Sequence, residues 1–229
     1  MPEFSVERTV HMELSGKKIN FLGDSITEGH GTSSFEHRFS NLIEKKTGAI
    51  CRNYGIGGTR IAAQQNPVNP GWDDNDFCGR IDKMDPDADI VVVFGGTNDF
   101  GHGDAPLGNM TDRTVNTFYG ALHVMCERLI ARYPEAAIVI ATPIHRCNEA
   151  SLHGDNKPTD IGNLKTYVNI IREVAEYYSL PLLDLYAMSG LQPLVPVIKE
   201  KYVPDGLHPN DAGHVILADK MIAFLKNTF

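Results

Sequence analysis

The chain has 229 residues, 42% of them hydrophobic and 22% charged, which is ordinary for one globular α/β domain with a sizeable core. Its formal net charge is −8 at pH 7, so we do not expect the basic patch that a nucleic acid or an anionic membrane surface would need. No stretch approaches the run of about 18 apolar residues that spans a membrane, and we therefore expect neither nucleic acid nor membrane as a partner.

The N-terminal segment 1–17 is mixed and polar, and it lacks the apolar core of a signal peptide. We expect it to form an arm before a single domain over 18–229, and we expect the protein to be cytoplasmic. The cysteines have no paired spacing such as C-x-x-C, which predicts free, buried thiols rather than disulfides. These residues are Cys51, Cys78, Cys126 and Cys147.

The first elements are a strand, a helix and a second strand. The apolar run 19–22 predicts a central strand. The segment 35–47 predicts a helix, because Phe35 and three further apolar residues fall on one face and Gly48 follows as a stop signal. A second short strand is predicted over 49–54.

The middle of the chain begins with a stretch rich in Asn, Pro, Gly and Asp at 64–76, which predicts a long loop of a kind that is often functional. The run 88–94 is the most apolar of the chain, and its consecutive β-branched residues are typical of a central parallel strand. Apolar residues recur every three or four positions over 111–133, which predicts an amphipathic helix, and 138–141 predicts another strand.

The remainder predicts, in order, a polar loop at 143–158, a helix at 160–178, a strand at 182–185, a partly irregular segment at 186–205 and a helix from Asn210 or Asp211 to about 227. Strands that alternate with long helices imply right-handed βαβ units. The sequence therefore predicts a three-layer α/β/α sandwich around a parallel sheet of five strands.

Glycine-bearing turns follow three of the predicted strands, at the sheet edge where ligands bind in open parallel sheets. The first turn carries Ser25, the second offers the backbone N–H groups of Gly57 and Gly58, and the third carries the amide of Asn98. Each turn taken alone fits an ordinary cap or loop equally well. Their convergence on one edge is what points to a site.

Asp205 and His208 add a carboxylate and an imidazole three residues apart, just before the last predicted helix. A serine hydroxyl such as that of Ser25 is a weak nucleophile, so it needs a general base and a third group that fixes the tautomer of that base. Attack on an ester also creates an oxyanion, which the N–H groups of Ser25 and Gly58 and the amide of Asn98 can stabilise. The rival bases are other loop histidines, namely His30, His102, His145 and His153.

Several other kinds of site are excluded by their missing motifs. The fragment at 55–58 is too short for a dinucleotide fingerprint, and there is no phosphate-binding G-x-x-x-x-G-K-[ST] loop. No H-E-x-x-H motif occurs and the nine histidines have no metal-ligand spacing, so we expect no metal. Ser25 also lacks the second glycine of G-x-S-x-G, which excludes the α/β-hydrolase elbow.

Four fragments occur in a fixed order, namely Gly-Asp-Ser at 23–25, N-x-G-x-G-G at 53–58, G-G-T-N-D at 95–99 and D-x-x-H at 205–208. This order resembles the GDSL-type, or SGNH, hydrolase family of esterases and lipases, over nearly the whole of 18–229. The second fragment is the loosest match and depends mainly on Asn53 and Gly58. Ile26 stands where the family name has Leu, a nearly isosteric change.

The resemblance implies a role for each matched residue. Ser25 would be the nucleophile and one oxyanion donor, and Gly58 and Asn98 would be the other two donors. His208 would be the base and Asp205 its orienting acid. The resemblance also implies a flavodoxin-like sheet order and neither a metal nor an organic cofactor.

The substrate is less constrained, because the family is associated with lipid, thioester and acetylated-sugar substrates. Trp72, the only tryptophan, can stack a sugar ring or pin its acidic loop to the core. His145 is a second candidate substrate-binding residue. The absence of a long apolar lid segment favours a small or carbohydrate ester with a short acyl group such as acetyl.

Three alternatives stay open at this point. The chain can be a lipase or thioesterase for longer acyl chains, or a non-catalytic carbohydrate-binding member of the same fold. The intact set of Ser, Gly, Asn, His and Asp argues against the second of these. A flavodoxin-like nucleotide or signalling domain is the third, and the missing phosphate loop argues against it.

Overall fold

Five short strands form one parallel sheet in the computed structural model, which describes residues 12–66, 75–159 and 161–229. Their order is β2-β1-β3-β4-β5, the flavodoxin-like order of a doubly wound sheet. The strands are β1 (Lys18–Gly23), β2 (Ile50–Gly55), β3 (Ile90–Phe94), β4 (Ala137–Ala141) and β5 (Leu182–Leu183). The predicted three-layer sandwich with five parallel strands is confirmed.

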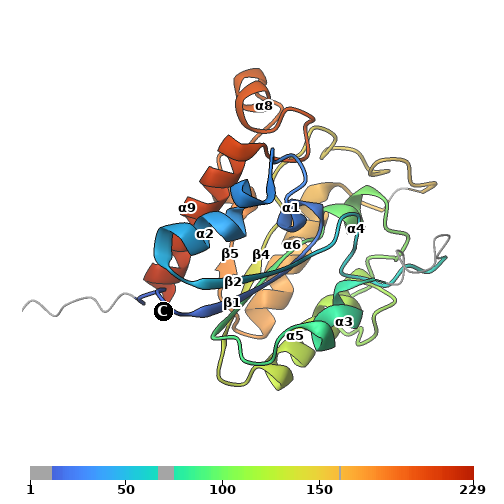
Figure 1. Ribbon diagram of the computed structural model, residues 1–229. Helices are drawn as coiled ribbons and strands as arrows, with labels where there is room; N and C mark the ends of the chain where they lie inside the picture. Colours follow the sequence, from blue (N-terminus) through green and yellow to red (C-terminus); the bar gives the residue numbers. More distant parts are fainter. Residues whose placement is uncertain (1–11, 67–74, 160) are drawn as a thin grey trace, which may run out of the picture.

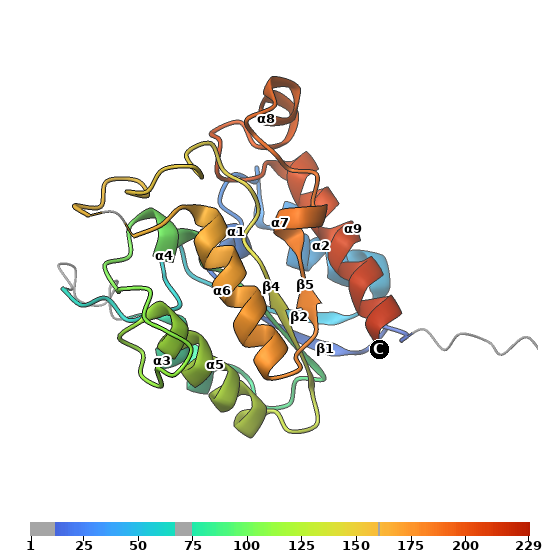
Figure 2. The ribbon, with the colours of Figure 1, turned by 180° about the vertical axis from the view of Figure 1, so that it is seen from behind.

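Helices cover both faces of the sheet (Figures 1 and 2). Side chains alternate between the faces, so Leu22 and Val93 enter one apolar core while Phe21 and Val92 enter the other. The first core is closed by α3 (Phe77–Arg80), α5 (Phe118–Arg132) and α6 (Leu164–Tyr177), and the second by α2 (Phe39–Thr47) and α9 (Asp211–Thr228).

Short helices occupy the turns that the sequence left as loops. Two of them follow the carboxyl ends of β1 and β3, and two others precede α9 (Figure 1). They are α1 (Ser25–Glu28), α4 (Thr97–Gly101), α7 (Leu185–Met188) and α8 (Pro196–Tyr202), with 3-10 turns η1 (Phe35–His37) and η2 (Ile81–Lys83). No helix in the described part of the chain is long and apolar enough to cross a membrane.

Capping residues explain where the long helices begin. α5 starts seven residues later than predicted because Thr117 caps it by accepting a hydrogen bond from the N–H of Gly120. α6 starts at Leu164 because Asn163 accepts from the N–H of Thr166 in the same way. The predicted strand at 182–185 is too long, since Asp184 caps α7. Asn210, one of the two predicted caps, is the cap of α9.

The packing corrects a further expectation. The predicted helix at 35–47 is broken at Arg38, whose backbone is extended, so η1 and α2 are separate and Phe35 is 69% exposed instead of buried. In the expected N-terminal arm, Leu14 is completely buried in the core beside α9, and the N–H of Met12 donates to the carbonyl of Lys226. All four cysteines are free, as predicted, but the expectation that they are buried is wrong for Cys147, which is exposed, and Cys51 is only partly buried.

Candidate active site

Ser25 is the first residue of α1 and directly follows the carboxyl end of β1. Asp24 caps this helix by accepting from the N–H of Ile26 at 3.0 Å. The turn is too tight for a side chain at Gly23, because a Cβ there would lie 2.9 Å from the carbonyl oxygen of Phe94 and would overlap Thr27. The motif glycine is therefore needed to place the Ser25 hydroxyl at the sheet edge.

A chain of two hydrogen bonds joins Ser25 to the loop between α8 and α9. The hydroxyl oxygen of Ser25 is 3.0 Å from Nε2 of His208, and Nδ1 of His208 is 2.6 Å from Oδ2 of Asp205. The other carboxylate oxygen, Oδ1, accepts from the N–H groups of Leu207 at 2.8 Å and His208 at 2.7 Å. The carboxylate is thus held so that it accepts from Nδ1–H, which leaves Nε2 free to accept the serine proton.

The electrostatics favour a neutral imidazole and an ionised carboxyl. Burial lowers the pKa of His208 below its ordinary value of 6.5, although Asp205 acts in the opposite direction. The neighbouring His30, whose ring centroid is 4.4 Å from that of His208, lowers this pKa further. Burial on its own would raise the pKa of Asp205, but the hydrogen bonds from His208 hold it below the ordinary value. At neutral pH His208 is therefore able to accept a proton.

The predicted oxyanion donors come from the turns after β2 and β3. The turn after β2 lies against Ser25, the predicted nucleophile, since a Cβ built on Gly57 would be 3.6 Å from the Cβ of Ser25. The N–H of Gly57 is already bonded to Oε2 of Glu28 at 2.7 Å. Gly58, with φ of +72° in the left-handed region that glycine favours, is then the candidate donor of this turn.

The amide of Asn98 is buried on α4 and is oriented by the same turn. Its Nδ2 donates to the carbonyl of Thr59 at 3.0 Å. An amide nitrogen carries two N–H groups, so this bond fixes the side chain and leaves a second donor for a ligand. Asn53 supports the arrangement, because its Nδ2 donates to the carbonyl of Thr27 at 2.6 Å and its Oδ1 accepts from the N–H of Gly55.

The comparisons with known proteins agree with this geometry. The sequence profile of the GDSL-like lipase/acylhydrolase family matches residues 21–216. The chain belongs to this family. No match was found among curated protein sequences.

Solved structures of the same fold cover almost the whole chain. One crystal structure is 34% identical, has a TM-score of 0.80, and the match covers 93% of this chain and 98% of that one. A protein from Lactobacillus plantarum is 29% identical with a TM-score of 0.80, over 94% of this chain and 99% of that one. An acetyl xylan esterase, AlAXEase, is 23% identical with a TM-score of 0.61, over 90% and 98%, and shows the shared fold only.

This member of the GDSL-like family also carries a buried arginine next to the site. No sequence motif indicates this arginine. Arg80, at the end of α3, is 4% exposed and donates through its two Nη atoms to the carbonyls of Tyr54 at 2.6 Å and Gly23 at 3.0 Å. It also reaches the hydroxyl of Thr59 at 2.9 Å and the carbonyl of Asn75 at 3.0 Å. Burial lowers its pKa to about 10, so it stays charged at neutral pH. One guanidinium thus ties together the ends of β1 and β2 and the residue that orients Asn98.

A second buried network fixes α4. The carboxylate of Asp99 accepts from the N–H groups of Ile61 and Ala62, both at 2.9 Å. Nζ of Lys157 donates to the carbonyl of Asp99 at 2.5 Å and to the hydroxyl of Tyr167 at 2.9 Å. Burial raises the pKa of Asp99 to about 6 and lowers that of Lys157 to about 8. These contacts hold the helix that carries the family asparagine.

The loop at 143–158 joins α4 to the loop that carries the family histidine. Arg146 is 6% exposed and donates to the carbonyl of Thr97 at 3.3 Å and to Oδ1 of Asp155 at 2.5 Å. The N–H of the next residue, Cys147, donates to the carbonyl of Gly206 at 2.8 Å. Sequence reasoning singled out this loop but gave Arg146 no role, because its partners are Thr97, far away in the sequence, and an aspartate of the same loop.

Of the two predicted substrate-binding residues, the structure describes His145. His145 contacts Glu149 and Gln192 through hydrogen bonds of 2.6 and 2.9 Å, and its ring lies 3.9 Å from that of Tyr186. These contacts join the loop at 143–158 to the segment that carries Tyr186 and Gln192. Trp72 lies outside the described residues. Of the histidines proposed as the base, it is His208 that bonds the Ser25 hydroxyl.

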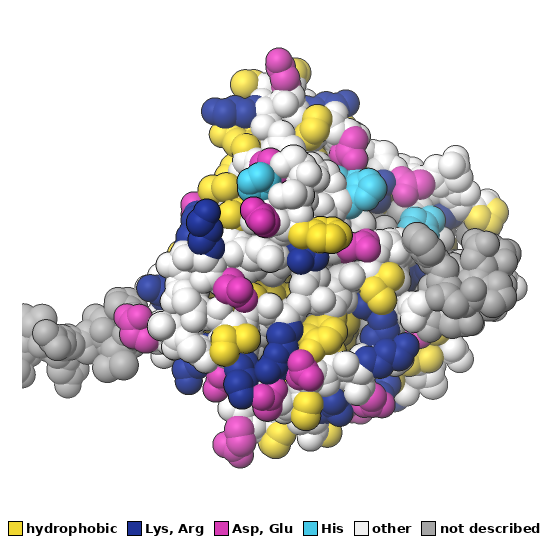
Figure 3. Space-filling view, in the orientation of Figure 1, with side chains coloured by type: hydrophobic (Ala, Val, Ile, Leu, Met, Phe, Trp, Pro, Cys, Tyr) yellow, Lys and Arg dark blue, Asp and Glu magenta, His cyan; other side chains and the backbone are white. Residues whose placement is uncertain are grey.

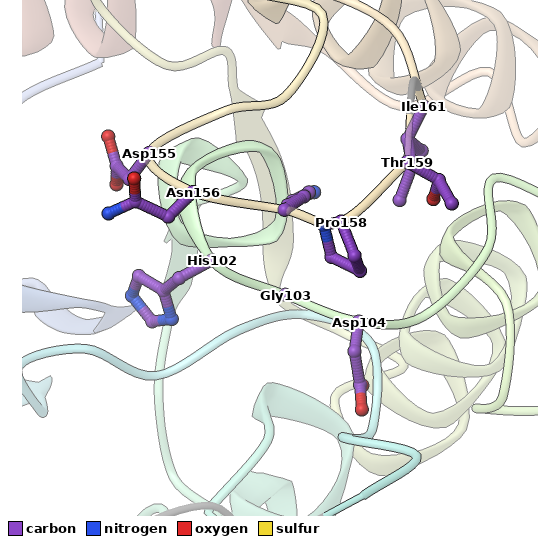
Figure 4. A pocket seen from close by; sticks show the side chains of 9 residues that line it. His102, Gly103, Asp104, Asp155, Asn156, Pro158, Thr159 and Ile161 are labelled. Carbon is purple, nitrogen blue, oxygen red and sulfur yellow. The ribbon is translucent and has the colours of Figure 1, made fainter.

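A cavity of about 250 Å³ lies beyond α4, lined by residues 102–104, 155–159 and Ile161 (Figure 4). Asp155, Asn156 and His102 stand on one side of it, and Thr159 and Ile161 on the other. Nη1 of Arg60 lies 3.2 Å from Nδ1 of His102 and 3.2 Å from the carbonyl of Gly58, so one arginine links the cavity to the oxyanion turn. In the described part of the chain, no group of three His, Cys, Asp or Glu side chains is placed to hold a metal.

Proposed function

We propose that this GDSL-like hydrolase is a serine esterase that cleaves short acyl groups, such as acetyl, from small or carbohydrate alcohols. The observation that carries this proposal is the continuous chain from the Ser25 hydroxyl through His208 to Asp205, with contacts of 3.0 and 2.6 Å. A neutral base in contact with a serine hydroxyl, oriented by a carboxylate, is the arrangement that acyl transfer needs.

The reaction follows from these contacts. As the hydroxyl oxygen of Ser25 attacks the ester carbonyl, Nε2 of His208 takes its proton, and the imidazolium is stabilised by Asp205. The N–H groups of Ser25 and Gly58 and the amide of Asn98 receive the developing oxyanion. Collapse of this intermediate breaks the bond to the alcohol, which leaves with the proton from Nε2. A water molecule, deprotonated by the same nitrogen, then releases the acid and restores the serine.

The preference for short acyl groups and polar alcohols is supported by hydrogen-bonding side chains in the lining of the cavity beyond α4, among them His102, Asp155 and Asn156. The acetyl xylan esterase that shares the fold acts on such an ester by its name. A second candidate, a lipase or thioesterase for longer chains, is favoured by the exposed apolar side chains at the start of α8, Leu194, Val195 and Val197. Rates on p-nitrophenyl acetate, butyrate and octanoate, followed by acetylated sugars, separate the two.

Substitution of the nucleophile tests the whole proposal. Ser25→Ala should abolish ester turnover without loss of folding, because losing a nucleophile costs on the order of 10³-fold or more. A serine-reactive phosphonate should label wild type at Ser25. Ser189→Ala, which removes another buried hydroxyl outside the triad, is the matched control and should keep the rate. Residual turnover of Ser25→Ala above about a hundredth of wild type would exclude the mechanism.

A further inference from the structure

A hollow of about 390 Å³ lies on the surface between the end of α1 and η1. It is lined by Glu28, Gly29, His30, Gly31, Thr32 and Phe35. None of these residues belongs to the triad or to the oxyanion donors. In the space-filling view, histidine side chains gather on the upper half of this face, where α1 and α4 lie, whereas Lys and Arg are more frequent below (Figure 3).

The walls of the hollow adjoin the proposed triad on two sides. On one side the His30 ring packs against the His208 ring, with centroids 4.4 Å apart. A Cβ built on Gly31 would come within 3.2 Å of the Cβ of His208. On the other side Glu28 bonds the N–H of Gly57, which borders Ser25. A group attached to an ester bound at Ser25 can therefore extend into this hollow.

The position beside His208 identifies which part of the ester would lie there. The alcohol oxygen must receive its proton from Nε2 of His208 when the acyl bond breaks, so the alcohol leaves on the imidazole side. The hollow is on that side, since His30 forms its wall and contacts the imidazole. The geometry thus relates the hollow to the alcohol and not to the acyl group.

Phe35 gives the hollow one apolar wall that the fold does not need. Its side chain is 69% exposed, and no residue of η1 is buried. The Arg38 guanidinium lies over its ring at 4.5 Å from the centroid, and Nε of Arg38 donates to the carbonyl of Phe35. The ring of Phe35 is therefore held by an arginine on one face and is otherwise exposed. It can serve as a stacking surface for a ligand and is not part of the core.

The polar wall complements this platform. Glu28 offers carboxylate oxygens and His30 an imidazole, both of which bond hydroxyl groups. An aromatic ring opposed by a few placed hydrogen-bonding groups suits a ligand with one apolar face and a hydroxyl-bearing edge. A pyranose or furanose ring has that character, whereas an alkyl alcohol has no hydroxyl groups along its chain for the carboxylate and imidazole to bond.

We propose that this hollow is the subsite for the alcohol part of the substrate, and that this part is a carbohydrate ring stacked on Phe35 and bonded by Glu28 and His30. The proposal rests on the serine esterase function proposed above. It assigns the sugar platform to the segment after α1 and not to the predicted tryptophan.

The test compares the selectivity of Phe35→Ala with that of wild type. The ratio of kcat/KM for an acetylated xylo-oligosaccharide to kcat/KM for ethyl acetate should fall about three- to tenfold, chiefly through KM, as expected for losing one aromatic contact. Phe35→Trp should restore the ratio. Tyr177→Ala is the matched control, because Tyr177 is also an exposed aromatic residue with an arginine over its ring. It lies at the end of α6, which leads into the amino end of β5, whereas the site lies at the carboxyl ends of the strands. Tyr177→Ala should leave the ratio unchanged.

Other outcomes overturn the proposal in distinct ways. An unchanged ratio in Phe35→Ala, with ethyl acetate still hydrolysed and Ser25 still labelled, would refute the subsite while leaving the esterase function intact. An equal loss on cyclohexyl acetate, a ring without hydroxyl groups, would show that the hollow takes an apolar alcohol and would refute the carbohydrate assignment. Failure of wild type on every ester, with no labelling of Ser25, would instead refute the proposed function.

Discussion

Arg80 should control the rate of catalysis although it has no place in the reaction itself. Substitution by Lys keeps the charge but loses the planar fork that reaches Gly23, Tyr54 and Thr59 at once. The buried carbonyl of Tyr54 would lose its charged donor, and an unsatisfied buried group costs about 1–3 kcal/mol. The carbonyl of Gly23 would keep one donor, because it also accepts from the N–H of Ile56 at 3.2 Å.

Two effects follow from this loss, one on stability and one on rate. Arg80→Lys should lower the free energy of unfolding by about 1–3 kcal/mol. Arg80→Met should lower it by about 3–5 kcal/mol, because it also removes the charge that faces the buried Asp24. In the folded fraction of Arg80→Lys, kcat should fall by about 10²-fold with a smaller change in KM, as when one oxyanion donor is misplaced. The reason is that Thr59, held by Arg80, orients the amide of Asn98.

The assay combines urea unfolding with kcat and KM on p-nitrophenyl acetate, measured well below the unfolding transition. Arg128→Lys is the matched control, because Arg128 also donates to a backbone carbonyl, that of Cys78 at 2.6 Å, and to Asp82, but touches no loop of the site. Millimolar guanidinium should partly restore kcat in Arg80→Ala by occupying the vacated space. The reasoning is refuted if Arg80→Lys loses stability but keeps the kcat of the control.

The remaining predictions concern the proposed machinery and one buried carboxyl. Because burial lowers the pKa of His208, kcat/KM should rise with pH in a step below 6.5, and a step above that value would contradict the assignment. Asn98→Ala should lower kcat about 10²-fold with KM little changed, whereas a change in KM alone would make Asn98 a binding residue. Asp205→Ala should lower kcat about 10- to 10³-fold, which is less than His208→Ala, because Asp205 orients the base and does not transfer the proton. Equal losses in the two variants would contradict this division of roles. Burial raises the pKa of Asp24 from 3.8 to about 7, so its contribution to stability is present below pH 3.8 and is lost as pH rises towards 7. Asp24→Asn should remove this pH-dependent loss of stability, so the fall in Tm between pH 5 and pH 8 should be smaller than in wild type. An equal fall in the two proteins would refute the raised pKa of Asp24.

The sheet and the convergence of the motif residues could be predicted because both depend on strand direction. Parallel strands bring their carboxyl ends to one edge, so Ser25 after β1 and Asn98 after β3 had to lie near each other. The contact of His208 with Ser25 crosses 183 positions and came from the resemblance to a family, since no local pattern specifies it.

Helix boundaries were less predictable, because apolar periodicity cannot distinguish a helix from a loop that packs on the same core. Val115 continues the apolar pattern of α5, but it lies in the loop before that helix. Its side chain packs against the same core, and its carbonyl accepts from the N–H of Ala63. Ile161 extends the pattern of α6 in the same way. The polar caps Thr117 and Asn163 decide where the two helices begin. The sequence alone does not show whether such a cap or the apolar pattern that precedes it sets the helix start.

The parts of the site that were missed act through backbone atoms. Arg80 binds three carbonyl groups and one hydroxyl, and carbonyl groups belong to every residue, so no sequence spacing marks such a partner. Glu28 was passed over for the same reason, because its partner is the N–H of Gly57. Phe35 was misjudged by periodicity, since the extended backbone at Arg38 turns η1 away from the face that α2 buries.

The distance along the chain between the proposed nucleophile and the proposed base has a consequence for biosynthesis. Ser25 and His208 are 183 positions apart, and a ribosome that adds about 5–20 residues per second takes about 10–40 s to pass from one to the other. A nascent chain that has already paired β1 with β3 holds the serine but no base, so it cannot cleave esters until the segment after α8 has emerged and docked. In refolding, recovered ester turnover should accordingly lag behind the far-ultraviolet signal of the sheet and helices, and it would report the last docking step.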